Sequence, residues 1–364
     1  MIKIFDLNNC ELSYKNASYG GMAGSKEGII FEGEEWLIKY PKNLSSMTGE
    51  VASYSTSPLS EFIGSHIYSI LGYDVHDTML GIRNGKVVVG CKDFATYNKM
   101  LLEIRTIKNF YNKELCDISD SSHISSSQTH IVDIDELLLH FQKNPVLTQI
   151  KGVKERFFEQ AIVDVFIANN DRNNGNWGII REIDKPDTLA PIYDNGASFN
   201  SKITDEKLLS IYNSPEFVNN STNIVMAYGQ NGHAFSAKKL FKFFENDPLF
   251  IQSIKKIVPL INQKFNNIKN MIYDIPEEVM SKKEEPVKII SDVRKNIYIA
   301  QMETRYEKLL LPEYELLTFK EHNPPQDFSN LEQITYKIDS FIESGGLEQL
   351  DRDENNFLSE NMTL

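Results

Sequence analysis

Three side chains in the middle of the sequence have the types and spacing needed for phosphoryl transfer. Asp171 and Asn176 lie five positions apart in a polar turn, and Asp194 follows eighteen positions after the asparagine. A kinase uses a carboxylate to orient the attacking hydroxyl and accept its proton, and amide and carboxylate oxygens to hold magnesium beside the phosphates. The spacing therefore suggests Asp171 as the catalytic aspartate, with Asn176 and Asp194 as ligands of Mg²⁺.

One helix and two short strands are expected to position these side chains. The apolar pattern predicts a helix over about 154–169 that ends in the polar turn. It also predicts a short strand over 177–180 and a second strand over 190–194. The three candidate residues would then lie at the ends of elements, where their side chains can meet.

A further pair of candidates lies in a β-rich stretch with one helix over residues 1–96. Lys39 ends an alternating strand, and kinases present a strand lysine to the phosphates of the nucleotide. A solvated lysine on an edge strand is the alternative. Glu61 lies on the first turn of an amphipathic helix expected over 58–71. It either pairs with Lys39 or only complements the helix dipole.

Backbone groups in the same stretch are candidates for nucleotide binding. The glycine-rich segment over 19–28 contains Gly21, Gly24 and Lys26, and its N–H groups could cover a polyphosphate. A plain hairpin turn explains the glycines equally well. Lys92 and Phe94 lie at the end of the last expected strand of this stretch, over 86–94, where their backbone groups could meet an adenine edge.

Composition limits the class of protein. The chain has 364 residues and a net charge of −13, which argues against nucleic acid or an anionic membrane as its main partner. It has no apolar run long enough to span a membrane and no signal peptide. Its three cysteines are widely spaced, which favours a reduced compartment. A cytoplasmic protein is expected where it is made.

The pattern along the chain predicts an α+β, two-lobed protein kinase-like fold. A small β-rich N-lobe would cover residues 1–96, and a larger helical C-lobe would cover 97–320. The helical character is expected to start at Tyr97 and run through Ile104. The serine-rich stretch over 117–130 is expected to be a linker, and 321–364 a peripheral tail.

The order of these motifs resembles the HipA-like serine/threonine kinases over residues 12–320. The resemblance is to a short form, of which a secreted bacterial kinase is typical, without the extra N-terminal domain of the toxin members. It implies ATP and Mg²⁺ as cofactors, a protein substrate, autophosphorylation, and possible export as an effector by a non-classical route. It also implies an antitoxin-like regulator as a candidate partner. The segments that carry the resemblance are Leu37–Pro41, Ser60–Gly64, Cys91–Phe94, Asn170–Gly178 and Ala190–Asp194.

Two positions depart from the patterns of related kinases. Asn173 stands where the family usually has a histidine, and it cannot carry a proton. The metal-binding segment reads Asp194-Asn195-Gly196, without the phenylalanine of ordinary kinases. By the resemblance, Ser18 or Ser25 beside the glycine-rich segment is a candidate autophosphorylation site.

Two other functions fit parts of the pattern. A kinase for a small molecule or a lipid would share the turn and the metal-binding aspartate, although the acidic composition disfavours a lipid. A catalytically silent nucleotide-binding scaffold is favoured by Asn173. It is disfavoured by the presence of Lys39, Asp171, Asn176 and Asp194 together.

Overall fold

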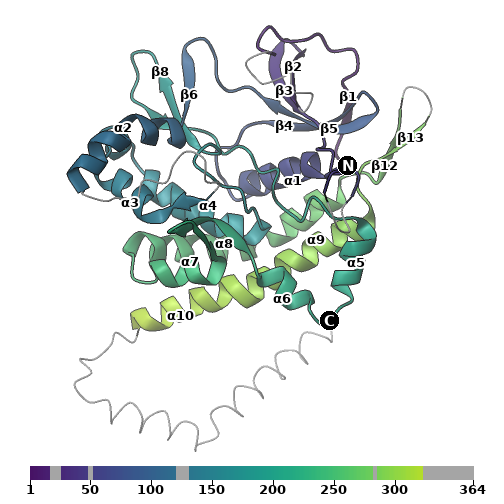
Figure 1. Cartoon of the computed structure of the whole chain (residues 1–364). Coiled ribbons are helices and arrows are strands. Elements are labelled where there is room, and N and C mark those ends of the chain that lie inside the picture. The colour runs from purple at the N-terminus through teal and green to yellow at the C-terminus, as the bar shows by residue number, and fades with distance from the viewer. Residues whose placement is uncertain (17–25, 48–51, 120–130, 282–284, 323–364) are drawn as a thin grey trace, which may run out of the picture. The chain divides into compact units, whose positions relative to one another are not determined.

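The computed structural model describes residues 1–16, 26–47, 52–119, 131–281 and 285–322. The chain divides into two compact units, Met1–Leu317 and Thr318–Leu364. The first unit combines β-sheets with helices, as the predicted α+β class requires (Figure 1). The expected lobe boundary near residue 96 lies inside this unit and stays a prediction.

The N-terminal part of the first unit is a five-stranded sheet. Its order is β1-β4-β5-β3-β2, with β1 parallel to β4 and the other pairs antiparallel. Helix α1 packs against β4 and β5. The bounds of these elements are β1 Ile4–Asp6, β2 Lys26–Phe31, β3 Glu34–Lys39, α1 Ser57–Ile70, β4 Thr78–Arg83 and β5 Lys86–Lys92.

Strand alternation decides which way Lys39 points. Successive side chains of a strand face opposite sides of the sheet. Ile38 lies on one side, in a small core with Ile29 and Val88. Lys39 therefore faces the other side of the sheet, where α1 lies.

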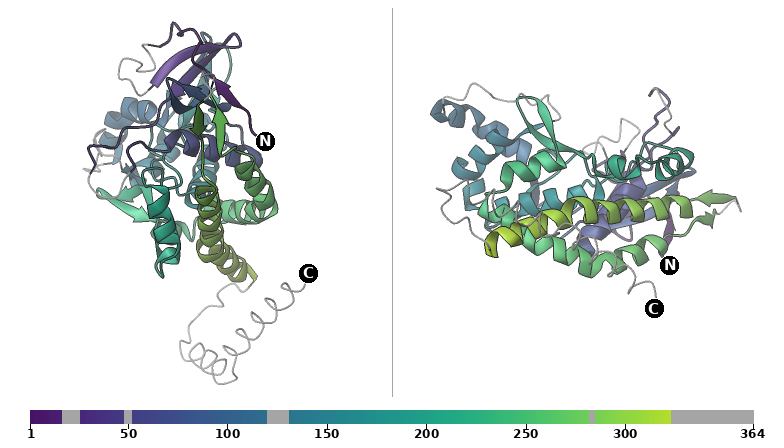
Figure 2. Two further views of the ribbon diagram at one scale, coloured as in Figure 1. Left: turned by 90° about the vertical axis from the view of Figure 1, so that its right-hand side faces the viewer. Right: turned by 90° about the horizontal axis from the view of Figure 1, so that it is seen from below.

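The remainder of the first unit is mainly helical. Helices α4 and α8 pack against each other, and α9 packs against both. Figure 2 shows α8 and α9 side by side along the lower face. The elements are β6 Lys99–Glu103, α2 Ile104–Ser119, β7 Val132–Asp133, α3 Ile134–Lys143, η2 Leu147–Gln149, α4 Val153–Ile167, β8 Gly178–Glu182, β9 Thr188–Leu189, α5 Asp205–Tyr212, α6 Phe217–Thr222, β10 Val225–Gln230, β11 His233–Ser236, α7 Ala237–Phe244, α8 Pro248–Tyr273, β12 Glu278–Met280, β13 Pro286–Lys288, α9 Asp292–Arg305, η3 Tyr306–Leu310 and α10 Leu311–His322.

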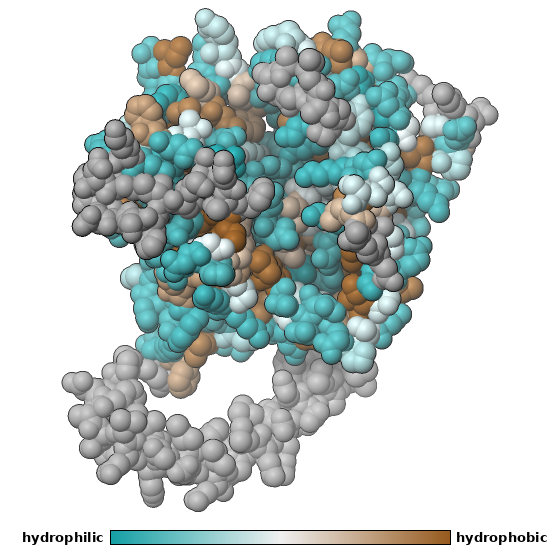
Figure 3. All heavy atoms as spheres, viewed as in Figure 1, coloured by the Kyte–Doolittle hydropathy of each residue, from teal (hydrophilic) through white to brown (hydrophobic). Residues whose placement is uncertain are grey.

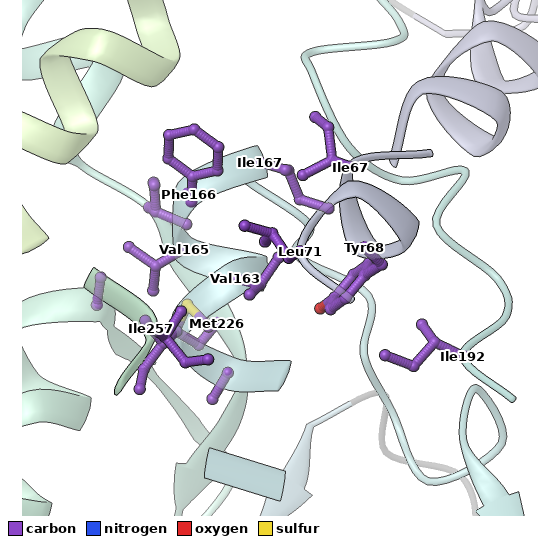
Figure 4. Packing of buried hydrophobic residues seen from close by; sticks show 14 of the residues in the cluster. Ile67, Tyr68, Leu71, Val163, Val165, Phe166, Ile167, Ile192, Met226 and Ile257 are labelled. Atoms are coloured by element: carbon purple, nitrogen blue, oxygen red, sulfur yellow. The ribbon is translucent and has the colours of Figure 1, made fainter. Parts of the chain in front are cut away.

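Helix α4 lies at the centre of the main hydrophobic core. Its residues Val163 and Ile167 face Ile67 of α1 and Leu71, which directly follows α1, as Figure 4 shows, and all four side chains are buried. Each large aliphatic side chain buried in this way contributes about 1.5–3 kcal/mol. The core thus fixes α4, which is followed by the turn that contains Asp171, against α1, which carries Glu61.

Two expectations about secondary structure were wrong. Residues 99–103 form β6 instead of the start of a helix, because they pair antiparallel with β8, a partner distant in sequence. Helix α2 begins only at Ile104. Residues 190–194 are not a strand either: β9 ends at Leu189, and the following segment makes a single bridge between Val75 and Ile192.

A bilayer requires a minimum length and hydropathy of any helix that crosses it. No described helix is both long and apolar enough to cross a bilayer. The face in Figure 3 is mainly hydrophilic, with hydrophobic residues in small separate groups. The cytoplasmic location expected from the sequence stays a prediction.

Candidate active site

Lys39 brings two distant carboxylates together. Its ammonium group lies 2.9 Å from Oε2 of Glu61 and 2.9 Å from Oδ1 of Asp194. Glu61 comes from α1, and Asp194 comes from the loop after β9. The pairing of Lys39 with Glu61 is therefore present in the structure, and the aspartate proposed to bind metal joins it.

The surroundings of this cluster favour its charged forms. Burial opposes the charge of Lys39, but the carboxylates of Asp194 and Glu61 hold its pKa well above the ordinary value. Burial also opposes the charge of Glu61, yet Lys39 and His76 hold the pKa of this carboxyl well below its usual range. Both side chains are thus charged near neutral pH.

Glu61 is fixed by contacts on its other oxygen. Oε1 lies 3.1 Å from Nε2 of His76 and accepts a hydrogen bond of 3.1 Å from the backbone N–H of Asn195. The glycine at position 64 lets the Asn195 loop approach α1, since a Cβ there would lie 2.8 Å from Cβ of Asn195. A glycine inside a helix costs about 1 kcal/mol, and here it permits close packing.

Helix α4 ends at Ile167, shortly before the turn that contains Asp171. Ala168 has a left-handed backbone (φ 54°), which closes the helix. Asp171 follows in an exposed position. Its carboxylate accepts a 2.9 Å hydrogen bond from Nδ2 of Asn173, whose Oδ1 accepts one of 2.6 Å from Arg105. Asn173 therefore orients Asp171, although it cannot relay a proton.

A buried arginine ties together the parts of the site, and sequence reasoning missed it. Arg172 donates to both oxygens of Asp164, at 3.0 and 3.2 Å. It also donates to the backbone carbonyls of Asn176 and Tyr193, at 2.9 and 2.6 Å, and to the side-chain oxygen of Asn195. The turn, the metal-binding segment and α4 are thus linked by one side chain.

Asp164, the acidic partner of Arg172, has further hydrogen-bond donors around it. Asp164 accepts further hydrogen bonds from the Tyr68 hydroxyl of α1 at 2.9 Å and from Nδ2 of Asn169 at 3.1 Å. Burial opposes the charge of Arg172, but Asp164 raises its pKa above the ordinary value. The signal available in the sequence was an aspartate in the middle of an apolar helix.

Two cavities meet at the Lys39 cluster. One, of 640 Å³, is lined by Asp171 and Glu61, and we call it the acceptor cavity. The other, of 700 Å³, is lined by Asn176, and we call it the nucleotide cavity. Lys39 and Asp194 line both cavities. The candidate acid–base residue Asp171 and the candidate metal ligand Asn176 therefore line different cavities, which share Lys39 and Asp194 at their junction.

The nucleotide cavity also contains the residues expected to meet a base. Lys92 and Phe94 line it, and the Phe94 ring lies 5.8 Å from the Tyr193 ring. The N–H of Lys92 donates to the carbonyl of Asp77 at 2.9 Å, so this group is used inside the protein. Lys26 lines both cavities. Gly21 and Gly24, with Ser18 and Ser25, lie outside the described residues.

The oxygen atoms at the junction fit a hard divalent cation. The amide nitrogen of Asn176 donates to the backbone carbonyl of Asp171. The amide oxygen of Asn176 therefore points away from that carbonyl. The Asp194 side chain is 38% exposed, so its carboxylate is accessible. Carboxylate and amide oxygens are the ligand types that Mg²⁺ accepts. The side chains present therefore suit the metal that the sequence suggested.

The sheet, the lysine–glutamate pair and the cavity below them define a protein kinase-like fold. The chain is similar to the serine/threonine-protein kinase CtkA of Helicobacter pylori strain J99, with 30% identity over 225 residues. This match covers 58% of the chain and 65% of CtkA. The chain thus spans somewhat less than two thirds of that relative.

Structural similarity points to the same protein. The crystal structure of the H. pylori proinflammatory kinase CtkA matches with a TM-score of 0.71 and 21% identity, covering 89% of this chain and 100% of that one. The resemblance predicted from the sequence is confirmed: the chain is CtkA-like in sequence, and its fold is that of CtkA.

Two other comparisons give no further support for a function or a partner. The HipA–HipB toxin–antitoxin complex with operator DNA from Shewanella oneidensis MR-1 matches at a TM-score of 0.48, with 14% identity, over 87% of this chain and 69% of that one. That similarity is too distant to support a statement on partners. No protein-family model matches the sequence.

Proposed function

We propose that this chain is an ATP- and Mg²⁺-dependent protein kinase that phosphorylates Ser or Thr hydroxyls, including its own. Residues 1–96 would form the smaller lobe and residues 97–320 the larger one. The similarity to a serine/threonine kinase supports this assignment. The observation that carries it is the position of Lys39, which lies 2.9 Å from both Glu61 and Asp194 where the two cavities meet.

Each side chain has one role in this proposal. Bound ATP and Mg²⁺ would supply the phosphoryl group and offset its charge. Asp194 and Asn176 would hold the metal, and Lys39, kept in place by Glu61, would bind the phosphates. Asp171 would orient the acceptor hydroxyl and accept its proton at a carboxylate oxygen. Positioning and electrostatics supply most of the catalysis in such a site.

Substitution of Asp171 by asparagine tests the function. Asp171→Asn keeps the shape of the side chain but removes the proton acceptor, so we expect the transfer rate to fall on the order of 10²–10⁴-fold. Transfer of labelled phosphate from ATP to the chain itself and to a mixture of proteins measures this rate. The matched control is Asp184→Asn, an exposed aspartate in a turn after β8. Equal rates for wild type and Asp171→Asn would contradict the proposal.

Thermal unfolding with nucleotide separates the kinase from a silent scaffold. A ligand that binds the native state raises the unfolding temperature. For a kinase, we expect ATP with Mg²⁺ to stabilise the wild type more than ATP alone, and Asp194→Asn to lose that difference. Stabilisation by ATP that gains nothing from Mg²⁺, together with no transfer, would favour a scaffold. An antitoxin-like regulator stays a prediction.

A further inference from the structure

The acceptor cavity is lined by three lysines that do not belong to its ion-paired cluster of Lys39, Glu61 and Asp194. Lys26, Lys42 and Lys202 are exposed and line this cavity. In the part of the chain that the structure describes, none of them forms an ion pair. The lining of the cavity has four lysines (Lys26, Lys39, Lys42 and Lys202) against three carboxylates (Glu61, Asp171 and Asp194), a balance of +1 in a chain of net charge −13. The three exposed lysines are therefore available to a negatively charged ligand in this cavity.

Two of these lysines are separate from the nucleotide cavity. Lys26 lines both cavities and therefore faces the phosphate side as well. Lys42 and Lys202 line only the acceptor cavity among the described residues. Lys39 already pairs with Glu61 and Asp194. The positive charge of Lys42 and Lys202 thus remains for the molecule that brings the hydroxyl group.

The backbone holds these two lysines on either side of one short segment. The carbonyl of Lys42 accepts from the N–H of Ser55 at 2.9 Å, and the N–H of Lys42 donates to the Ser55 hydroxyl at 3.0 Å. On the other side, the carbonyl of Lys202 accepts from the N–H of Ala52 at 2.9 Å. Both backbones are fixed, and only the side chains need to adjust to a ligand.

The Lys202 loop is also anchored in the core. Phe199 is fully buried, and its ring stacks on Tyr298 of α9 with centroids 5.0 Å apart. The N–H of Phe199 donates to the carbonyl of Ile167 at the end of α4. The loop that carries Lys202 is therefore attached to the helix that delivers Asp171, which keeps the lysine at a set place relative to the catalytic turn.

We infer that Lys42 and Lys202 select protein acceptor segments with acidic residues beside the Ser or Thr. The inference rests on the proposed kinase function and adds a substrate class to it. Complementary charge at the rim of a site changes preference between ligands more than total affinity. Because an exposed ion pair contributes little, the two lysines together should give a preference of about 3- to 10-fold. Salt should weaken this preference, because it screens exposed charges.

Three acceptor peptides of equal length test the inference. Each has a single serine in the middle, flanked on both sides by glutamates, alanines or lysines. We expect wild type to show the highest kcat/KM for the glutamate peptide and the lowest for the lysine peptide. The double variant Lys42→Glu/Lys202→Glu should reverse or abolish that order. The matched control Lys151→Glu/Lys238→Glu changes the net charge equally at exposed sites and should keep the wild-type order.

The outcomes separate the inference from the function on which it rests. Absence of ADP formation and of transfer to any peptide or to the chain itself would contradict the kinase function. Transfer to all three peptides at equal rates would overturn the acidic preference and leave the function standing. A preference for glutamate that survives in the double variant would show that other residues are responsible. If the double variant unfolds, Lys42→Met/Lys202→Met removes the charge without adding acids, and it should lose the preference.

Discussion

Two cations in this molecule, one partly buried and one fully buried, differ in what their surroundings allow them to do. Lys39 lies at the junction of two cavities, and its side chain is 17% exposed, beside an Asp194 that is 38% exposed. Arg172 and Asp164 are 1% and 0% exposed, and the arginine donates hydrogen bonds to Asp164 and to the backbone carbonyls of Asn176 and Tyr193. In the proposed function the Lys39 cluster would exchange a protein carboxylate for a phosphate, whereas the Arg172 cluster would only hold the structure.

The two cations therefore have different roles in the site. A buried charge costs several kcal/mol to desolvate, and it is tolerated when a full set of partners repays that cost. Arg172 has this full set, so it stabilises the relative positions of the turn and the metal-binding segment. Lys39 has partners on one side and open space on the other, so it can meet a ligand. Substitutions at the two cations should therefore have different results.

Loss of Arg172 should have the largest effect. Arg172→Met leaves Asp164 buried without its main partner, so we expect the free energy of unfolding to fall by about 3–5 kcal/mol. Activity should fall with it, because the turn and the Asp194 segment lose their common anchor. Urea unfolding measures the first effect. The same change at Arg181, whose partner Asp187 is in an exposed pair, should cost less than about 1 kcal/mol. Equal losses at both arginines would refute a special role for Arg172.

Loss of Lys39 should reduce activity strongly and stability only a little. Lys39→Met removes the cation that faces the cavity, so we expect phosphoryl transfer to fall on the order of 10²–10³-fold. The free energy of unfolding should fall by only about 1–2 kcal/mol, because Glu61 keeps His76 and the Asn195 N–H as partners. Lys238→Met, at an exposed site on α7, serves as control. The comparison between the two cations fails if Lys39→Met destabilises the chain as much as Arg172→Met.

A smaller effect is expected in the pH dependence of stability, through Glu61 of the Lys39 cluster. The pKa of Glu61 is lowered in the native state, so its charge adds stability above the unfolded pKa of about 4.3 and this contribution is lost as pH falls further. Glu61→Gln should lack this component, which we expect to be on the order of 1 kcal/mol between pH 5 and 3. Urea unfolding of both proteins at these pH values gives the difference. Parallel pH dependence in wild type and variant would contradict it.

Much of the local structure could be predicted from the sequence. The strand that ends at Lys39 and the helices α1, α4, α7 and α8 follow from alternating or helical apolar spacing. Local patterns failed at 99–103, where an apolar run that looked helical became β6. Its strand partner β8 lies almost eighty residues further along the chain. Such a partner has no signature in the run itself.

The sequence determined which chemical groups are present near the cavities and in which order, since Lys39, Glu61, Asp171, Asn176 and Asp194 are recognisable by type and spacing. Tertiary structure alone decided that Lys39 touches both carboxylates and that Arg172 joins three distant segments. It also placed Lys42 and Lys202 around one cavity. The physical reason is that these contacts depend on how α1, α4 and the sheet pack together, and packing sums many weak interactions that no short stretch of sequence contains.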